Sequence, residues 1–230
     1  MNEEQQRTLR ERMVGEQLAP RGVTDPRVLD AMRRVPRHRF VPPDQSAHAY
    51  DDRPLPLPLG QSISQPLMVA LMLQAAQLAG NEHVLEIGAG SGYQAALLAE
   101  LAGQVTTVER LPELADGARQ VLQALGYSAV EVVTADGSEG YAPFAPYDRI
   151  VVAAGAPQVP EPLLRQLAPR GLLIIPVGNA LEQNLVVVAK DADGRISRRE
   201  TGWCAFVPLV GAAAWPDIPG RDANSGEQTV

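Results

Sequence analysis

A glycine-rich turn follows a short apolar run in residues 83–98, HVLEIGAGSGYQAALL. The run is typical of a buried strand, and the residues after the turn have the spacing of a helix. Three glycines, Gly88, Gly90 and Gly92, form the turn. Glycine lets the backbone approach a ligand closely, and the first turn of a helix offers unpaired N–H groups. The stretch therefore predicts a site for a nucleotide-like ligand.

An acidic residue beside this turn indicates the charge of the ligand. Glu86 lies on the strand, and the glycines follow G-x-G-x-G, not the G-x-G-x-x-G in which a third glycine admits a pyrophosphate. A carboxylate facing the turn repels a diphosphate and suits a cation such as the ammonium of an amino acid. We therefore expect S-adenosylmethionine rather than NAD. The alternative is an ordinary strand-to-helix turn, because glycine triplets also occur by chance.

Two further carboxylates follow neighbouring strands. Glu109 lies 21 positions after Gly88, at the spacing where a carboxylate accepts hydrogen bonds from both ribose hydroxyls. Asp136 could accept from an adenine amino group, while Gly137 lets the backbone come close. A solvated strand end is the alternative for Glu109, and a plain Asp-Gly turn is the alternative for Asp136.

Alternating strands and helices must position these residues. This alternation predicts a doubly wound α/β fold with a mostly parallel, Rossmann-like sheet. In such sheets ligands lie outside the carboxyl ends of the strands, where the strand order reverses. We predict strands at 83–88, 104–109, 130–134, 148–153 and 171–177, and helices at 92–102, 111–125 and 160–168.

The segments around this core have other patterns. Helices are predicted over 2–19 and after Asp25, followed by a proline-rich stretch, 36–63, whose apolar residues from Phe40 to Leu59 favour ordered packing. Ser64 lies near the N-cap of a helix that runs to about Ala79, with Pro66 near its first position. Beyond the core, the runs 184–190 and 195–210 have the pattern of a β-hairpin.

We predict a single domain over residues 1–211. It comprises an N-terminal helical and substrate-loop part (1–80), a cofactor-binding core (81–180) and C-terminal strands (181–211). Residues 212–230 carry no periodicity, so we expect a tail that frays.

The composition is typical of a soluble globular protein. The chain has 230 residues, 45% of them hydrophobic, and a net charge of −7, which argues against nucleic acid as a partner. The single cysteine, Cys204, excludes an intramolecular disulfide and a cysteine-rich metal site, so we expect no metal and a reducing compartment. The N-terminus lacks the apolar region of a secretory signal, and no apolar stretch is long enough to span a bilayer. We therefore expect a cytoplasmic protein, acting as a monomer, with no membrane contact.

Taken together, the motifs resemble the protein-L-isoaspartate O-methyltransferase family, which methylates the abnormal isoaspartyl carboxylate of damaged proteins. The serine segment GQSISQPLMVALM, which contains Ser64, and the closing FVPL are specific to this family. The motifs of the cofactor-binding core are shared with many methyl-transfer enzymes. The sequence departs from the family at Ala135 and Ser138, where Gly-Asp-Gly-Arg or similar is frequent. The matching segments, in the family's order, are VPRHRFVPP, GQSISQPLMVALM, VLEIGAGSGYQAALLA, VTTVERLPELA, ADGSEGY, APYDRIVVAAGAPQVPEPLLRQL, LLIIPVG and FVPLV.

This resemblance implies roles for several residues. Ser64 corresponds to the active-site serine, and the glycine turn, Glu109 and Asp136–Gly137 correspond to cofactor contacts. The donor is then S-adenosylmethionine and the product S-adenosylhomocysteine. The acceptors are isoaspartyl-containing proteins and peptides, repaired through a methyl ester and a succinimide.

A carboxylate acceptor needs no general base, because a carboxyl with a pKa near 3.9 is already ionised at pH 7. We accordingly expect His38, His48 and His83 to be structural or solvated. A strong cation would stabilise the anionic acceptor before transfer, so a single hydroxyl is better suited to hold the acceptor. We therefore predict that Ser64 orients the acceptor carboxylate by hydrogen bonding and is not a covalent nucleophile. If Ser64 only caps the helix, it has no substrate contact.

The proline-rich stretch 36–63 and residues 206–209 are expected to flank the same pocket. Ile63, Val207 and Pro208 would then contact substrate, and hydrogen bonds to extended peptide backbone would tolerate any flanking sequence.

Three alternative functions stay open. A methyltransferase of the same build could act on the carboxylate of one dedicated peptide. An NAD-dependent oxidoreductase is disfavoured by Glu86 and by the glycine spacing, and a non-catalytic adenosyl-binding module is disfavoured by the intact serine segment.

Overall fold

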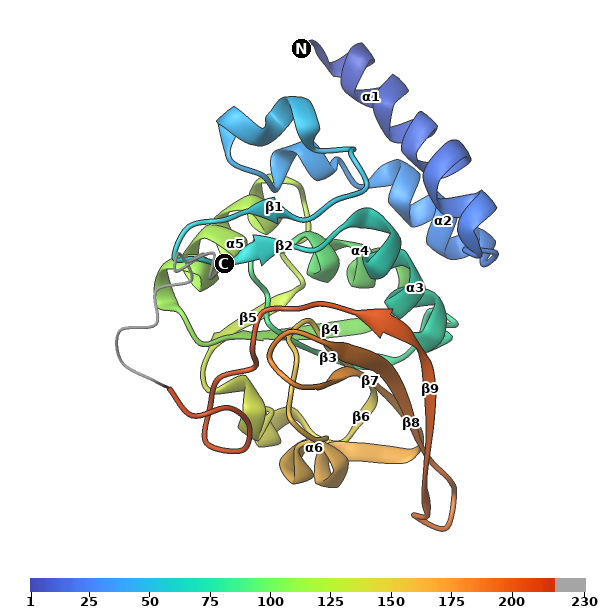
Figure 1. Cartoon of the computed structure of the whole chain (residues 1–230), viewed down its shortest axis with the longest axis vertical. Helices are drawn as coiled ribbons and strands as arrows, with labels where there is room; N and C mark the ends of the chain where they lie inside the picture. The colour runs from blue at the N-terminus through green and yellow to red at the C-terminus, as the bar shows by residue number, and fades with distance from the viewer. Residues whose placement is uncertain (218–230) are drawn as a thin grey trace, which may run out of the picture.

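A seven-stranded sheet forms the centre of the protein in a computed structural model that describes residues 1–217 (Figure 1). The strand order is β5-β4-β3-β6-β7-β8-β9; the first five run parallel, and β8 and β9 are antiparallel to their neighbours. The predicted mostly parallel α/β sheet with a C-terminal hairpin is therefore confirmed. The strands are β3 (His83–Ile87), β4 (Gln104–Glu109), β5 (Glu131–Thr134), β6 (Tyr147–Val152), β7 (Leu167–Gly178), β8 (Gln183–Lys190) and β9 (Ile196–Cys204).

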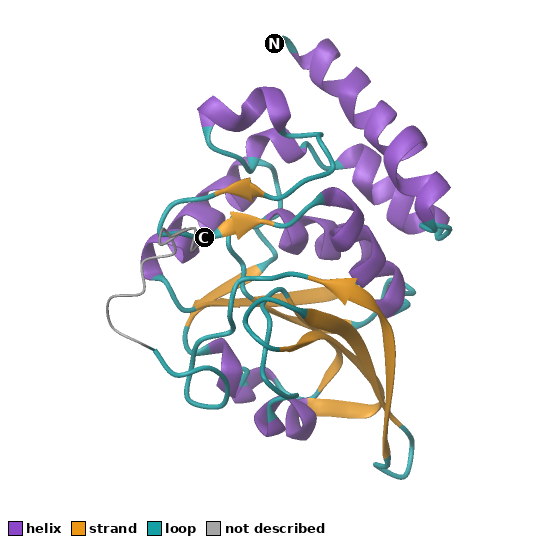
Figure 2. Cartoon of the chain, viewed as in Figure 1, coloured by secondary structure: helices purple, strands orange, loops and turns teal. Residues whose placement is uncertain are grey.

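Helices cover both faces of this sheet (Figure 2). On one face lie α3 (Pro66–Ala76), α4 (Tyr93–Leu101) and α5 (Pro112–Ala124), and on the other lies α6 (Glu161–Gln166). All the helices predicted for the core are present, with ends shifted by a few residues. Short 3-10 turns lie at η5 (Gly137–Glu139) and η6 (Ala142–Phe144).

The N-terminal segment adds a further layer outside α3 and α4. Here α1 (Glu3–Arg12) continues into a π-helical turn, η1 (Met13–Leu18), and a 3-10 turn, η2 (Ala19–Arg21), before α2 (Pro26–Arg34). As predicted, the Asp25 side chain caps α2 by accepting from the Arg27 N–H at 2.9 Å. No helix of the described residues is both long and apolar enough to cross a membrane.

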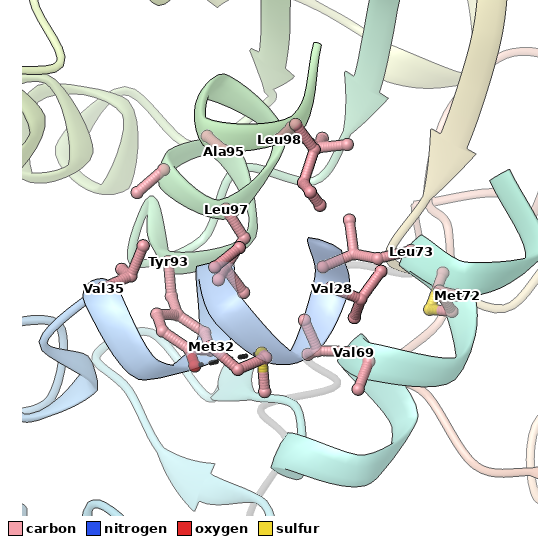
Figure 3. Packing of buried hydrophobic residues seen from close by; sticks show 14 of the residues in the cluster. Val28, Met32, Val35, Val69, Met72, Leu73, Tyr93, Ala95, Leu97 and Leu98 are labelled. Carbon is pink, nitrogen blue, oxygen red and sulfur yellow. Dashed lines mark hydrogen bonds between the residues drawn. The ribbon is translucent and has the colours of Figure 1, made fainter. Parts of the chain in front are cut away.

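An apolar core joins α2 to α3 and α4 (Figure 3). All three helices contribute buried side chains, α3 and α4 over most of their surface, and the Tyr93 hydroxyl lies 3.5 Å from the Met32 sulfur. This packing fixes the start of α4, and with it the glycine turn. Figure 3 labels Val28, Met32, Val35, Val69, Met72, Leu73, Tyr93, Ala95, Leu97 and Leu98.

The proline-rich stretch is ordered, as expected from its apolar residues. It forms η3 (Arg37–Arg39), η4 (Pro43–His48) and a small antiparallel hairpin of β1 (Leu55–Pro56) and β2 (Ser62–Ile63). Phe40 and Tyr50 are buried. Leu59 at the hairpin tip is 51% exposed, so it does not contribute to the packing of this stretch.

The helix α3 begins at Pro66 as predicted, but Ser64 is not its N-cap residue. Gln65 occupies the N-cap position without a side-chain cap bond, and Pro66 is the first helical residue. The reason is the proline, because the residue before a proline is restricted to extended backbone and therefore ends the loop. The helix also ends at Ala76, since Gln77 adopts a left-handed conformation, and does not reach Ala79.

The prediction that the chain frays from residue 212 is wrong for residues 212–217. The Trp215 indole N–H donates to the Gly155 carbonyl at 3.1 Å, and the Ala212 N–H donates to Asp136 Oδ2 at 2.8 Å. Both partners are distant in sequence, so periodicity carries no sign of them. The rest of the predicted tail, 218–230, lies outside the described residues.

The core makes a testable prediction about Leu97, which is 0% exposed. Leu97→Ala should lower the free energy of unfolding by about 2–5 kcal/mol, because it removes buried methyl groups and leaves a cavity. Urea denaturation measures the change. Leu181→Ala is the matched control, since the Leu181 side chain is 82% exposed and its loss should change stability by less than about 0.5 kcal/mol. Similar losses in both variants would contradict this assignment of the core.

Candidate active site

A cavity lies at the carboxyl ends of β3, β4 and β6, where the strand order reverses. This is the place where doubly wound sheets bind their ligands. Five segments supply most of its wall: residues 61–64, residues 87–91, residues 108–111, Ala153–Ala154 and residues 207–210. The cavity thus brings together parts of the chain that are up to about 150 positions apart in sequence.

The glycine turn has the conformation that its sequence predicts. Gly88, Gly90 and Gly92 have φ angles of 92°, 53° and 85°, a region that side chains other than glycine rarely adopt. Gly88 and Gly90 line the cavity. Gly92 does not line it and instead caps α4, where an added Cβ would lie 3.3 Å from Ala118 and Leu122.

Glu109 joins the end of β4 to this turn. Its Oε2 accepts from the Gly90 N–H and its Oε1 accepts from the Leu111 N–H, both at 3.0 Å. The carboxylate lines the cavity and is only 7% exposed. Each carboxylate oxygen can accept a second hydrogen bond. Glu109 can therefore receive two more donors, as the two hydroxyls of a ribose require.

Ser64 also lines the cavity, next in sequence to the buried Ile63. Its carbonyl accepts from Arg37 Nη2 at 2.8 Å. Among the hydrogen bonds of the described residues, none uses the Ser64 hydroxyl, so the alternative that this hydroxyl caps α3 is not what the structure has. The hydroxyl can therefore bond to a molecule in the cavity.

Val207 and Pro208 complete the wall near Ser64. Their backbone is held by Gly155, whose N–H donates to the Val207 carbonyl at 2.8 Å. Gln183 holds the start of the same segment, because its Oε1 accepts from the Phe206 N–H at 2.8 Å. The extended segment after β9 is thereby fixed at the cavity by Gly155, which follows β6, and by Gln183, the first residue of β8.

The structure places Asp136 differently from the expectation. Gly137 lines the cavity, but Asp136 does not. Asp136 Oδ1 accepts from the Ser138 N–H and hydroxyl at 2.9 and 2.7 Å, and Oδ2 accepts from the Ala212 N–H at 2.8 Å. Partial burial raises the pKa of Asp136, but the hydrogen bonds from Ala212 and Ser138 lower it overall. The carboxylate thus holds the C-terminal turn instead of facing the cavity.

Glu86 also departs from its expected position. Alternate residues of β3 point to opposite faces, so Ile87 lines the cavity while Glu86 lies behind it, fully buried. Its Oε2 accepts from the Thr107 hydroxyl at 2.5 Å, and its Oε1 has no partner among the described residues. Burial raises the pKa of Glu86 to about 8. Glu86 therefore lies behind the cavity wall and does not face the turn from within the cavity, as was expected.

Comparison with known proteins identifies the family. The family model described as protein-L-isoaspartate(D-aspartate) O-methyltransferase matches residues 9–214. The chain belongs to this family. A protein-L-isoaspartate O-methyltransferase of Methanoculleus marisnigri is 52% identical over 206 residues, 90% of this chain and 93% of that protein. One of Rhodopseudomonas palustris is 51% identical over 215 residues, 92% of this chain and 99% of that protein.

Solved structures of the same description share the fold of this methyltransferase. One of them is 29% identical with a TM-score of 0.79, covering 89% of this chain and 67% of that one. A Plasmodium falciparum protein, solved in complex with S-adenosyl-L-homocysteine, is 24% identical with a TM-score of 0.77, covering 87% of this chain and 98% of that one. The family match also reaches residue 214, four positions beyond Val210, where the last matching segment, FVPLV, ends.

The histidines of this methyltransferase lie away from the cavity. His38 Nδ1 lies 2.8 Å from the Tyr50 hydroxyl oxygen, His48 bonds to Asp51, and the His83 ring packs on Tyr147 at 4.7 Å. In the described part of the chain, no three His, Cys, Asp or Glu side chains are grouped to hold a metal ion. Each histidine thus has a structural contact in the fold.

Several cavity residues were not identified from the sequence. Ala153 and Ala154 follow β6, and their place at the carboxyl end of a parallel strand is a signal that could have found them. Tyr93 and Gln94 of α4 follow the glycine turn directly. Val210, one position beyond the segment 206–209 that was expected to flank the pocket, also lines it.

Glu86 makes a prediction about pH dependence. The folded protein holds a proton on Glu86 up to about pH 8, whereas the unfolded chain loses it near pH 4.3. Between these values the unfolded state binds fewer protons, so stability falls as pH rises, by up to about 1.4 kcal/mol per pH unit. Glu86→Gln removes this loss. Thermal unfolding should show the variant more stable than wild type at pH 8, with the difference shrinking toward pH 5.

Glu131→Gln is the control, because Glu131 carries the same chemical change on an exposed strand position. A stability difference between Glu86→Gln and wild type that is the same at pH 5 and pH 8 would show that Glu86 is not protonated in the folded state.

Proposed function

We propose that this protein transfers a methyl group from S-adenosylmethionine to the free carboxylate of L-isoaspartyl residues in damaged proteins and peptides. The observation that carries the proposal is that one cavity is lined both by Gly88, Gly90 and Glu109 and by Ser64 and Pro208. Membership in the protein-L-isoaspartate(D-aspartate) O-methyltransferase family supports it. The products are S-adenosylhomocysteine and a methyl ester, from which a succinimide can form during repair.

The part of the cavity lined by Gly88, Gly90 and Glu109, here called the donor half, fits an adenosyl group. Glu109 has two free acceptor positions for the ribose hydroxyls, and Gly88 and Gly90 line the cavity without side chains. Gly137 packs closely, since an added Cβ would lie 2.5 Å from Ile87 Cγ2. When bound, S-adenosylmethionine supplies an electrophilic methyl group, which passes to the acceptor oxygen as its bond to sulfur breaks and the electron pair stays on sulfur.

The part of the cavity lined by Ser64 and Pro208 is here called the acceptor half. We assign Ser64 the role of orienting the acceptor carboxylate there by a hydrogen bond from its hydroxyl. An ionised acceptor has no proton to lose, so alignment replaces acid–base chemistry. Alignment at near-attack distance can supply up to about 7–11 kcal/mol of the barrier. Apolar side chains of Ile63, Val108 and Leu209 in the wall exclude water, which favours a reaction in which an anion and a cation become neutral.

The segments around the acceptor half suit an extended peptide. Ile63 comes from the β1–β2 hairpin, and Val207 and Pro208 come from the extended segment after β9, so we assign these three residues to substrate contact. Hydrogen bonds to peptide backbone would accept many flanking sequences. We further propose that the enzyme acts as a monomer in the cytoplasm, with no nucleic acid or membrane as partner, in keeping with its charge of −7.

The activity test uses labelled S-adenosylmethionine with an isoaspartyl peptide beside its normal aspartyl twin. We expect label in the isoaspartyl peptide alone, because only that isomer presents the carboxylate at the required reach from the backbone. Several unrelated isoaspartyl peptides should all be substrates. Methylation of only one of them would favour an enzyme with a dedicated peptide substrate, and labelling of neither isomer would refute the proposal.

Ser64→Ala tests the role of the hydroxyl. We expect kcat/KM for an isoaspartyl peptide to fall by about 10- to 100-fold, the usual worth of a hydrogen bond to a charged group. The melting temperature should change little, because this hydroxyl does not cap α3. Steady-state kinetics and thermal unfolding measure the two effects. Ser128→Ala, at an exposed position, is the control, and unchanged turnover in Ser64→Ala would remove Ser64 from the mechanism.

A further inference from the structure

Arg37 is a fully buried cation directly behind the acceptor half of the cavity. Its side chain is 0% exposed, and it belongs to the short turn η3 in the segment VPRHRF. Its Nε donates to the Ala49 carbonyl and its Nη2 to the Ser64 carbonyl, each at 2.8 Å. The guanidinium carbon lies 4.8 Å from the centre of the Tyr93 ring.

No carboxylate of residues 1–217 forms an ion pair with Arg37; the carboxylate whose charge favours that of Arg37, Asp52, pairs with Arg21 instead. Its Nη1 has no hydrogen-bond partner among the described residues. Burial lowers the pKa of Arg37 to about 10, so the guanidinium still carries its charge at neutral pH. A buried charge without a counterion is costly. The two carbonyls and the face of Tyr93 offset only part of that cost.

The contacts of Arg37 connect this charge to the proposed acceptor site. Ser64 and Tyr93, both in contact with the guanidinium, line the cavity, whereas Arg37 itself does not. The positive charge is therefore one layer behind the place where an anionic acceptor would bind. In a poorly hydrated interior such a charge acts over a longer distance than it would in water.

We propose that Arg37 is a positioning residue that selects an anionic acceptor. It fixes Ser64 through the Ser64 carbonyl, and its unneutralised charge gives the acceptor half a positive potential. This inference rests on the proposed function, because it concerns the carboxylate that Ser64 orients. Arg37 does not touch the reacting atoms.

The direction of the kinetic effect follows from the charge change during reaction. The acceptor is fully negative before transfer and loses that charge in the transition state. A nearby cation therefore stabilises the bound acceptor more than the transition state. Loss of the Arg37 charge should accordingly raise KM for the peptide and leave kcat unchanged or slightly higher.

The test uses the full chain with Arg37→Met and Arg37→Lys. For each, KM and kcat are measured with an isoaspartyl peptide, and S-adenosylmethionine affinity is measured by titration. Inhibition constants are then compared for the isoaspartyl peptide and for a twin whose free carboxylate is a primary amide. We expect Arg37→Met to raise KM at least tenfold, to change kcat less than threefold and to reduce the preference for carboxylate over amide about tenfold.

Arg37→Lys keeps the charge and should retain that preference within about threefold. The matched control is Arg27→Met. The Arg27 guanidinium also donates to backbone carbonyls, including that of Leu101 at 3.0 Å, but it lies away from the cavity. Its loss should lower the melting temperature without changing the preference for carboxylate over amide.

An unchanged carboxylate preference in folded Arg37→Met, with wild type active on the isoaspartyl peptide, would overturn this inference alone. Wild type without activity on that peptide would instead refute the proposed function. If Arg37→Met does not fold, Arg37→Gln, which keeps a donor without the charge, decides by the same ratio of inhibition constants.

Discussion

The hydrogen bond from the Gly90 N–H to the Glu109 carboxylate joins two strand ends on which the whole site depends. It connects the glycine turn after β3 to the end of β4, and the Leu111 N–H fixes the same carboxylate from the next helix. The two backbone donors orient Glu109 while leaving it free acceptor positions toward the cavity. The packing of α2 against α3 and α4 holds the start of α4 behind the turn (Figure 3).

Two buried ionisable side chains lie just outside the cavity wall, a glutamate that burial keeps protonated and an arginine that keeps its charge. Glu86 lies behind the glycine turn with one unpartnered oxygen, and Arg37 lies behind Ser64 with one unpartnered nitrogen. Neither reaches the cavity directly, so both act through the residues in front of them. In a reaction between a cation and an anion, a fixed charge one layer behind the wall can favour binding of the anionic acceptor. A direct ion pair would stabilise the bound acceptor more strongly and so raise the barrier to the transition state.

The C-terminal turn is the least expected part of the site. It places Leu209 in the cavity wall, and Asp136 and Ser138 hold it through the Ala212 and Ala213 N–H groups. Gly211 permits this approach, because an added Cβ would lie 2.0 Å from Asp136 Oδ1. Ser138 is one of the two positions at which the sequence departs from the family's pattern, and here its hydroxyl serves this turn. The carboxylate predicted to contact adenine thus also holds this turn.

The sequence by itself determined the succession of strands and helices along the chain and the glycine turn. It also determined the family segments that contain Ser64, Glu109 and Pro208. These features are local, since periodicity and backbone restriction depend on neighbours only a few positions apart. Tertiary structure decided the rest: that Glu86 lies behind the wall, that Asp136 bonds to Ala212, and that Arg37 supports Ser64. These contacts join residues 27 to 76 positions apart or depend on which face of a strand is covered, so no local pattern encodes them.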